Sequence, residues 1–171
     1  MKNTNPRVGV LMGSDSDWEV MSAAARRLEG FAIPYEVTVT SAHRAPQRTA
    51  AYASSARDRG LQVLICGAGV AAHLAGVVAA HTSLPVIGVP LEAGSLRGWD
   101  ALLATVQMPP GVPVATVAVG KAGAENAAIL AVQILALGDA DLQRRLDQFK
   151  TELARQVEEK DARLQQQRRG S

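Results

Sequence analysis

Residues 41–46 (Ser-Ala-His-Arg-Ala-Pro) place a histidine beside an arginine where a strand is predicted to end. A histidine gives and takes protons near neutral pH, and an arginine binds anions through parallel hydrogen bonds. A strand-like run at residues 35–40 precedes the segment, and a helix-like run begins near Gln47. Ligands of α/β proteins bind at the carboxyl ends of such strands. The pattern predicts acid–base chemistry by His43 on a phosphorylated small molecule held by Arg44.

Both residues also have simpler explanations. A lone histidine is often a hydrogen-bonded core residue, and an arginine is often one half of a surface ion pair. Their shared place at a strand end favours a ligand site, because an arginine is not readily buried without an anion.

A second polar turn follows an apolar strand-like run at residues 8–12. Glycine lets a backbone approach a ligand closely, serine hydroxyls donate hydrogen bonds, and the next helix offers free N–H groups. We therefore expect Gly13, Ser14 and Ser16 to form a phosphate site. The Asp17 carboxylate suits sugar hydroxyls, which are donors. Plain capping of the helix by this turn is the alternative.

Small residues follow a third strand-like run, at residues 63–66. They would let a flat ring lie close to the backbone, although tight helix–strand packing also explains the glycines. His73 falls in the first turns of the next predicted helix and faces the same crevice. The small residues are Gly67, Ala68, Gly69 and Ala71.

The other candidate ligands suggest no metal site. His43, His73 and His81 lack neighbouring cysteines or clustered carboxylates, so their spacing is not that of a metal centre. His81 lies near the end of a predicted helix, where it is interpreted as structural. Cys66 precedes Gly67 and is interpreted as a small buried strand residue, not a nucleophile.

Composition narrows the class of protein. The chain has 171 residues, of which 47% are hydrophobic, which suits one domain with a substantial core. The net charge is only +2 and aromatic residues make up 4%, so a nucleic-acid partner is not expected. The single cysteine excludes an internal disulfide and fits a reducing cytoplasm. The polar N-terminus predicts no signal peptide, and no apolar run is long enough to span a membrane.

Strand-like and helix-like runs alternate along the chain. The strands are expected at residues 8–12, 35–40, 63–66, 85–89 and 114–119, and the helices at 16–29, 47–59, 71–81 and 122–137. This order predicts an α/β fold: a three-layer, doubly wound parallel sheet of about five strands, flavodoxin- or Rossmann-like, with an extended C-terminal helix.

Four segments are expected along the chain: an irregular N-terminus (1–6), a catalytic domain (7–138), a last helix (139–164) and a tail (165–171). Asp139 can cap the last helix. Its apolar positions follow a helical spacing on an otherwise charged sequence, so the helix needs an apolar surface to cover. We expect that surface on a neighbouring subunit; the chain's own domain is the alternative. The apolar positions are Leu142, Leu146, Phe149, Leu153 and Val157.

Four motifs together resemble a known family. They are residues 12–18 (Met-Gly-Ser-Asp-Ser-Asp-Trp), 41–44 (Ser-Ala-His-Arg), 67–74 (Gly-Ala-Gly-Val-Ala-Ala-His-Leu) and 106–109 (Val-Gln-Met-Pro). In order and spacing they resemble the PurE family, the bacterial-type N5-carboxyaminoimidazole ribonucleotide mutases of purine biosynthesis. The resemblance extends over about residues 7–150.

The resemblance implies an enzyme that moves a carboxylate from the exocyclic nitrogen of an aminoimidazole ribonucleotide to a ring carbon. It implies no metal, ATP or biotin, and a homo-octamer with active sites at subunit interfaces. His43 would be the general acid and base. Ser14, Ser16 and Arg44 would hold the phosphate and Asp17 the ribose. The remaining residues expected to bind substrate are Gly13, Ser41, Gly67, Ala68, Gly69, Ala71 and His73.

The chain departs from the family pattern at three positions. Val70 stands where many members have glycine, Ala75 where many have proline, and Ala101 where a serine is common. Since Val70 and Ala75 remain small or apolar, a variant pocket wall with retained activity is expected there, whereas Ala101 gives no support for a ligand role at that position. A floor of Ala68, Val70 and neighbouring alanines suits holding carbon dioxide between decarboxylation and recarboxylation.

Three alternative functions remain. The related carboxylases use free carbon dioxide and carry lysine in place of Arg44. A non-catalytic ribonucleotide-binding module would not need His43. A flavodoxin-like electron carrier would need aromatic residues around a flavin, and the chain has few.

Overall fold

The computed structural model describes residues 5–169, so residues 1–4 and 170–171 of the expected terminal segments lie outside the described residues. Its five strands are all parallel and lie in the order β2-β1-β3-β4-β5. This is the strand order of flavodoxin-like sheets and confirms the predicted fold class. The strands are β1 (Val8–Met12), β2 (Tyr35–Val39), β3 (Val63–Gly69), β4 (Val86–Leu91) and β5 (Ala115–Thr116).

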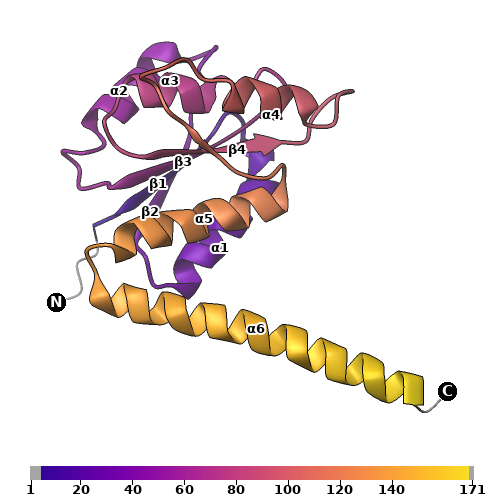
Figure 1. The fold of residues 1–171 in the computed structure, drawn as a ribbon. Helices are drawn as coiled ribbons and strands as arrows, with labels where there is room; N and C mark the ends of the chain where they lie inside the picture. Colours follow the sequence, from indigo (N-terminus) through magenta and orange to yellow (C-terminus); the bar gives the residue numbers. More distant parts are fainter. Residues whose placement is uncertain (1–4, 170–171) are drawn as a thin grey trace. The chain divides into compact units, whose positions relative to one another are not determined.

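Helices cover both faces of the sheet (Figure 1). α1 and α5 lie on one face, and α2, α3 and α4 lie on the other. A short 3-10 helix, η1 (Asp15–Asp17), leads into α1. The helices are α1 (Trp18–Gly30), α2 (Pro46–Ser55), α3 (Leu74–Ala80), α4 (Trp99–Val106) and α5 (Lys121–Ala136).

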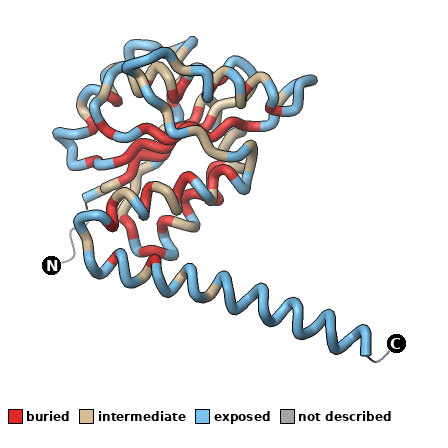
Figure 2. The backbone as a smooth tube through the Cα atoms, viewed as in Figure 1, coloured by how far each residue is buried: buried red, intermediate tan, exposed pale blue. Residues whose placement is uncertain are grey.

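The core follows from the apolar runs in the sequence. Every residue of β1 and β4 is buried, because a central parallel strand has helices against both faces. The edge strand β2 is only partly buried. Figure 2 shows the buried residues along the strands and on the helix faces turned toward them. On one face, Leu11, Leu64 and Cys66 of the sheet share a cluster with Leu74 and Val78 of α3. Each buried leucine contributes about 1.5–3 kcal/mol.

Helix α4 is absent from the expected elements. It begins after Gly98, whose φ of 89° is left-handed and which provides no side-chain cap. Its buried residues are the small Ala101 and Thr105, whereas Trp99 and Leu103 are exposed. In an ordinary amphipathic helix the large apolar residues are buried, whereas in α4 Trp99 and Leu103 are exposed. The spacing of apolar residues therefore did not indicate α4 as a core-packed helix.

Two boundaries near the third strand differ from expectation. Gly67–Gly69 were expected in a loop, but they belong to β3, where Gly67 pairs with Val89 and Gly69 with Leu91 of β4. The helix expected from residue 71 begins only at Leu74, because Val70 turns the chain with a φ of 55°. Pairing with β4 therefore extends β3 to Gly69, and the turn at Val70 delays the start of the helix that the local sequence pattern predicted from residue 71.

Two further elements, a helix and a strand, are shorter than expected. α2 ends at Ser55 and gives way to turns that close at Gly60, whose φ is 94°. β5 contains two residues where six were expected. Beyond them, Val117 and Gly120 still donate hydrogen bonds to β4, at Gly88 and Pro90, but without a continuous ladder.

The contacts divide the chain into two compact units, the first ending at Ile134 and the second beginning at Leu135. The second unit contains α6 (Ala140–Arg169). Asp139 caps this helix by accepting a hydrogen bond from the Leu142 N–H at 3.0 Å, as expected. α6 continues past the expected end at residue 164, because glutamine and arginine are good helix formers. None of the helices among residues 5–169 is both long and apolar enough to cross a membrane.

Candidate active site

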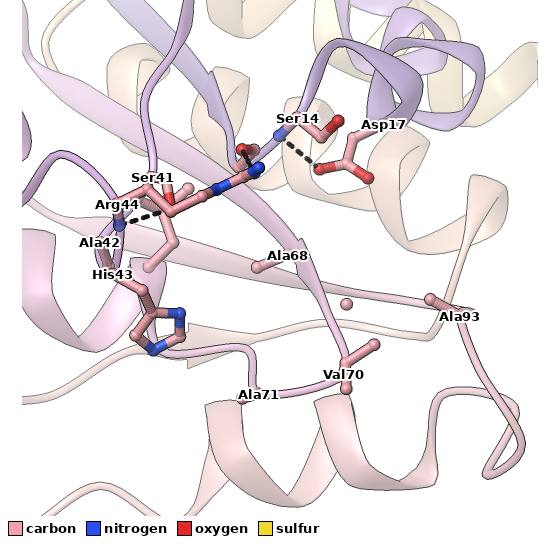
Figure 3. A pocket seen from close by; sticks show the side chains of 13 residues that line it. Ser14, Asp17, Ser41, Ala42, His43, Arg44, Ala68, Val70, Ala71 and Ala93 are labelled. Carbon is pink, nitrogen blue, oxygen red and sulfur yellow. Dashed lines mark hydrogen bonds between the residues drawn. The ribbon is translucent and has the colours of Figure 1, made fainter.

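A pocket of about 410 Å³ lies at the carboxyl ends of β1, β2 and β3. The sheet register brings these ends together, because Met12 at the end of β1 lies opposite Val39 of β2 and Gly67 of β3. Figure 3 shows the side chains that surround the pocket. They belong to Gly13, Ser14, Asp17, Ser41, Ala42, His43, Arg44, Ala68, Gly69, Val70, Ala71, Leu74 and Ala93.

The turn after β1 is fixed by its own hydrogen bonds. Ser14 caps η1, since its Oγ accepts a hydrogen bond from the Ser16 N–H at 3.4 Å. The Ser16 hydroxyl lies 2.9 Å from the same Oγ. The Asp17 Oδ2 accepts the Ser14 N–H at 3.0 Å, which completes a capping box. The turn is thus a helix cap whose backbone is held by its own hydrogen bonds.

The turn after β2 is held in the same way. The Ser41 Oγ accepts the Arg44 N–H at 3.1 Å, and the Ser41 carbonyl accepts the Ala45 N–H at 2.9 Å. Behind the turn, the buried hydroxyls of Thr40 and Thr49 lie 2.8 Å apart and join the end of β2 to α2. His43 and Arg44 are therefore presented by a backbone that is fixed on both sides.

Arg44 connects the two turns. Its Nη2 donates a hydrogen bond to the Gly13 carbonyl at 3.1 Å, across 31 positions of sequence. The side chain is exposed, and a single carbonyl uses only part of its donor capacity. The guanidinium therefore has donors left for an anion in the pocket.

His43 and His73 contact each other. The His43 Nε2 and the His73 Nδ1 lie 2.7 Å apart, and the rings meet edge to face at 80°. One of these two nitrogens must donate the hydrogen bond to the other. Since Nε2 of His43 is engaged, its Nδ1 is the nitrogen left for another partner.

The Asp17 carboxyl lies in a partly buried place. Burial raises the pKa of Asp17 above its ordinary value of 3.8, while hydrogen bonds from Ser14 and Gly13 and the charge of Arg44 act in the opposite direction. Burial therefore weakens the acidity of this group without removing its hydrogen-bonding capacity.

The other half of the pocket is apolar. Ala68 and Gly69 come from β3, Ala71 and Val70 from the turn after it, and Ala93 from the segment after β4. Val70 has a φ of 55°, which is unusual for a β-branched residue. In Figure 3 Val70 and Ala93 lie on the side of the pocket away from Arg44.

Most of the residues chosen from sequence line this pocket, but three do not. Ser16 is exposed beside Ser14, Gly67 is buried within β3, and His73 reaches the site through its contact with His43. A Cβ on Gly67 would meet the Met21 side chain, so packing explains this glycine.

Three lining residues were not anticipated: Ala42, Leu74 and Ala93. Ala42 and Leu74 lie inside two of the motifs quoted above, which was an available signal. Ala93 follows β4, and nothing in its local sequence marks it.

The described residues contain no group of three or more histidines, cysteines or carboxylates that could hold a metal ion. Cys66 is buried in β3, and that burial raises the pKa of its thiol. A thiol that resists ionisation is a poor nucleophile, in keeping with its interpretation as a core residue.

The chain is similar to several known proteins. A family model described as AIR carboxylase matches residues 7–156. An N5-carboxyaminoimidazole ribonucleotide mutase of Mycobacterium tuberculosis is 58% identical over 94% of this chain and 91% of its own. The mutase of Pyrococcus horikoshii is 51% identical over 97% of this chain and 93% of its own.

A solved structure supports the same relationship. The crystal structure of Treponema denticola PurE superposes with a TM-score of 0.83 at 28% identity, covering 93% of this chain and 98% of that chain. The fold and the identity over nearly the whole length agree. The chain therefore belongs to the AIR carboxylase family, whose members include the PurE mutases.

Proposed function

We propose that this protein is an N5-carboxyaminoimidazole ribonucleotide mutase of purine biosynthesis. It converts 5-carboxyamino-1-(5-phospho-D-ribosyl)imidazole to 5-amino-1-(5-phospho-D-ribosyl)imidazole-4-carboxylate. The observation that carries the proposal is a single pocket with His43, Arg44 and Asp17 on one side and small apolar residues on the other. Two relatives with this name, 51% and 58% identical over most of this chain, support it.

The reaction moves one carboxylate and returns one proton. Protonated His43 gives a proton to the carbamate nitrogen, the nitrogen–carbon bond breaks, and carbon dioxide leaves. The ring carbon C4 then attacks the carbon dioxide, forming the new carbon–carbon bond. His43 takes the proton from C4, which restores the aromatic ring and the starting state of the enzyme. We assign both transfers to Nδ1, because Nε2 contacts His73.

The polar residues position the nucleotide. Arg44 and Ser41 hold the phosphate together with the turn after β1, formed by Gly13, Ser14 and Ser16. Asp17 accepts hydrogen bonds from the ribose. The support is that Arg44 keeps unused donors beside this turn. Because Ser14 and Ser16 already bond to each other, the phosphate must replace part of that contact.

The apolar half holds the base and the migrating carboxylate. Ala68, Gly69 and Ala71 form its surface, with Gly67 behind them in β3 and His73 beside His43. Small apolar side chains leave room for a flat ring. They also form no hydrogen bonds to water, so they would keep water away from the carbon dioxide.

Supplying each substrate alone tests the proposal. The purified protein is expected to form the C4 carboxylate from the carbamate, and to do so without added bicarbonate. Turnover only with the amine and bicarbonate would instead identify a carboxylase, the activity named by the family model. Arg44, where that class carries lysine, favours the mutase.

We also propose that the protein acts in the cytoplasm as a homo-octamer with active sites near subunit interfaces. Leu96, Trp99, Leu103 and Val106 follow a helical spacing on the surface of α4 and the preceding loop, and Trp99 is 67% exposed. Such a stripe favours contact with another copy. Light scattering on the purified protein would measure the subunit number.

We further propose that residues 139–164 pack on a neighbouring subunit. Leu153 and Val157 of α6 are exposed among charged residues. Replacing both with glutamate is expected to reduce the measured mass of the assembly. An unchanged mass would contradict a role of these two side chains in contact with a neighbouring subunit.

A further inference from the structure

Val70 adopts a backbone conformation that suits glycine. Its φ is 55°, in the left-handed region, where the branched Cβ of valine crowds the neighbouring backbone. Two other non-glycine residues of the described chain have a positive φ, Ala32 and Arg97, and neither is β-branched. Val70 is thus the most sterically unfavourable of the three.

The Val70 side chain contributes little to the core of the fold. It is 52% exposed, and it belongs to no cluster of core residues that the structure forms around α3. A Cβ on Gly94 would lie 3.9 Å from its Cγ2, so the side chain lies beside the loop after β4 without being crowded by it. Neither burial nor backbone geometry explains why a valine stands here.

The side chain does face the pocket. Val70 lines it together with the much smaller Ala68, Ala71 and Ala93 (Figure 3). Leu74 is the other large apolar residue on this lining, but it is 2% exposed and serves the core. Val70 is therefore the bulky apolar group that the pocket presents to a ligand.

We propose that Val70 is a wall residue that retains carbon dioxide between the two halves of the reaction. The proposal rests on the proposed mutase function. Carbon dioxide carries no charge, so the hydrogen bonds of the polar half cannot hold it, and only steric enclosure opposes its escape. The isopropyl group narrows the apolar side of the pocket and keeps the released molecule near C4. Backbone strain of this kind persists where the surrounding structure imposes it, and it is concentrated at functional sites.

Isotope retention measures this role directly. The carbamate substrate is labelled with ¹³C on its carboxylate and converted in a medium that contains unlabelled bicarbonate. The fraction of product without ¹³C reports how often carbon dioxide escapes before C4 attacks it. Three variants are compared with the unaltered protein: Val70→Gly, Val70→Ala and Ala32→Gly.

Val70→Gly is expected to increase label loss several-fold and to raise the melting temperature, because glycine adopts this φ without strain. Val70→Ala is expected to give an intermediate label loss. Ala32→Gly is the matched control, since it relieves a positive φ of 51° in the loop before β2 without touching the pocket. Its label loss should equal that of the unaltered protein.

Equal label retention in Val70→Gly and the unaltered protein would overturn the proposal, and so would equal increases in Val70→Gly and Ala32→Gly. If Val70→Gly does not fold, the label loss of Val70→Ala is compared with that of the unaltered protein and of Ala32→Gly instead. If the unaltered protein forms no product from the carbamate, the mutase function itself fails, and the role of Val70 fails with it. A working mutase with unchanged retention in the variants would refute the role of Val70 alone.

Discussion

The two halves of the pocket are built in opposite ways. The polar half comes from the turns after β1 and β2, where Ser14, Asp17 and Ser41 accept backbone hydrogen bonds and Arg44 joins one turn to the other. The apolar half comes from β3 and the segments that follow β3 and β4, and includes Val70 in a strained conformation.

This difference indicates a division of work. A phosphate and a ribose are bound by directional contacts, so the residues around them must be fixed in advance. A small uncharged intermediate offers little to hydrogen-bond and can only be enclosed. In the proposed reaction the first half would determine what binds, and the second would determine what happens to the migrating group. Substitutions in the two halves should therefore change different measured quantities.

The largest effect is expected at His43, which the turn after β2 presents on the polar side of the pocket. His43→Asn should lower kcat by about 10²–10⁴, because it removes the group that transfers the proton. Nucleotide affinity should stay nearly unchanged, since the phosphate contacts remain. Steady-state kinetics and calorimetric binding of the product would separate the two quantities.

His81→Asn is the matched control, because this exposed histidine follows α3 outside the pocket. It should leave both quantities unaltered. A His43→Asn protein with full turnover would support a non-catalytic binding module and contradict the mutase proposal.

The next effect is expected at Arg44 and should appear in binding. Arg44→Ala removes charge-assisted hydrogen bonds to the phosphate, each contributing about 1.5–3 kcal/mol, so the Kd of the product should rise by about 10–100-fold. Calorimetry measures this change. Arg57→Ala, which removes an arginine bonded to Ser83 away from the pocket, should bind normally. If the unaltered protein, Arg44→Ala and Arg57→Ala bind the product with equal affinity, Arg44 does not belong to the phosphate site.

A third effect separates binding from packing on the apolar side. Gly67→Ala should lower the free energy of unfolding by about 1–3 kcal/mol, because the new Cβ would collide with Met21, which is fully buried. Urea unfolding would measure this change. If Gly67→Ala instead keeps its stability and loses only affinity, then Gly67 belongs to the ligand surface and not to the core behind it.

The smallest effect concerns Asp17 and pH. Its raised pKa means that the folded protein binds this proton more tightly than the unfolded chain does. The free energy of unfolding should therefore fall as the pH rises from 3.8 through the higher folded pKa. Asp17→Asn should lack this decrease. Urea unfolding of both proteins across acid pH measures the difference, and a stability advantage of the unaltered protein that grows with pH would contradict the sign.

Local sequence determined much of this protein. The apolar runs predicted β1 and most of β3 and β4, since a strand buried on both faces needs continuous apolar residues, and the strand-like run at residues 35–40 predicted the edge strand β2. The alternation of strands and helices led to the parallel sheet. The residue types at the ends of β1 and β2 indicated His43, Arg44 and Asp17, because acid–base chemistry and anion binding need particular side chains.

Only the tertiary structure decided the rest. The contact between His43 and His73 joins residues 30 positions apart, and no local pattern encodes it. Gly67 became a packing residue because α1 places Met21 against it. Ala93 lines the pocket because β4 pairs in parallel with β3 and ends at the same edge of the sheet, and the left-handed φ of Val70 is seen only in the structure. Sequence specifies which chemistry each residue can perform, whereas distances between separate strands depend on how the whole sheet and its helices pack.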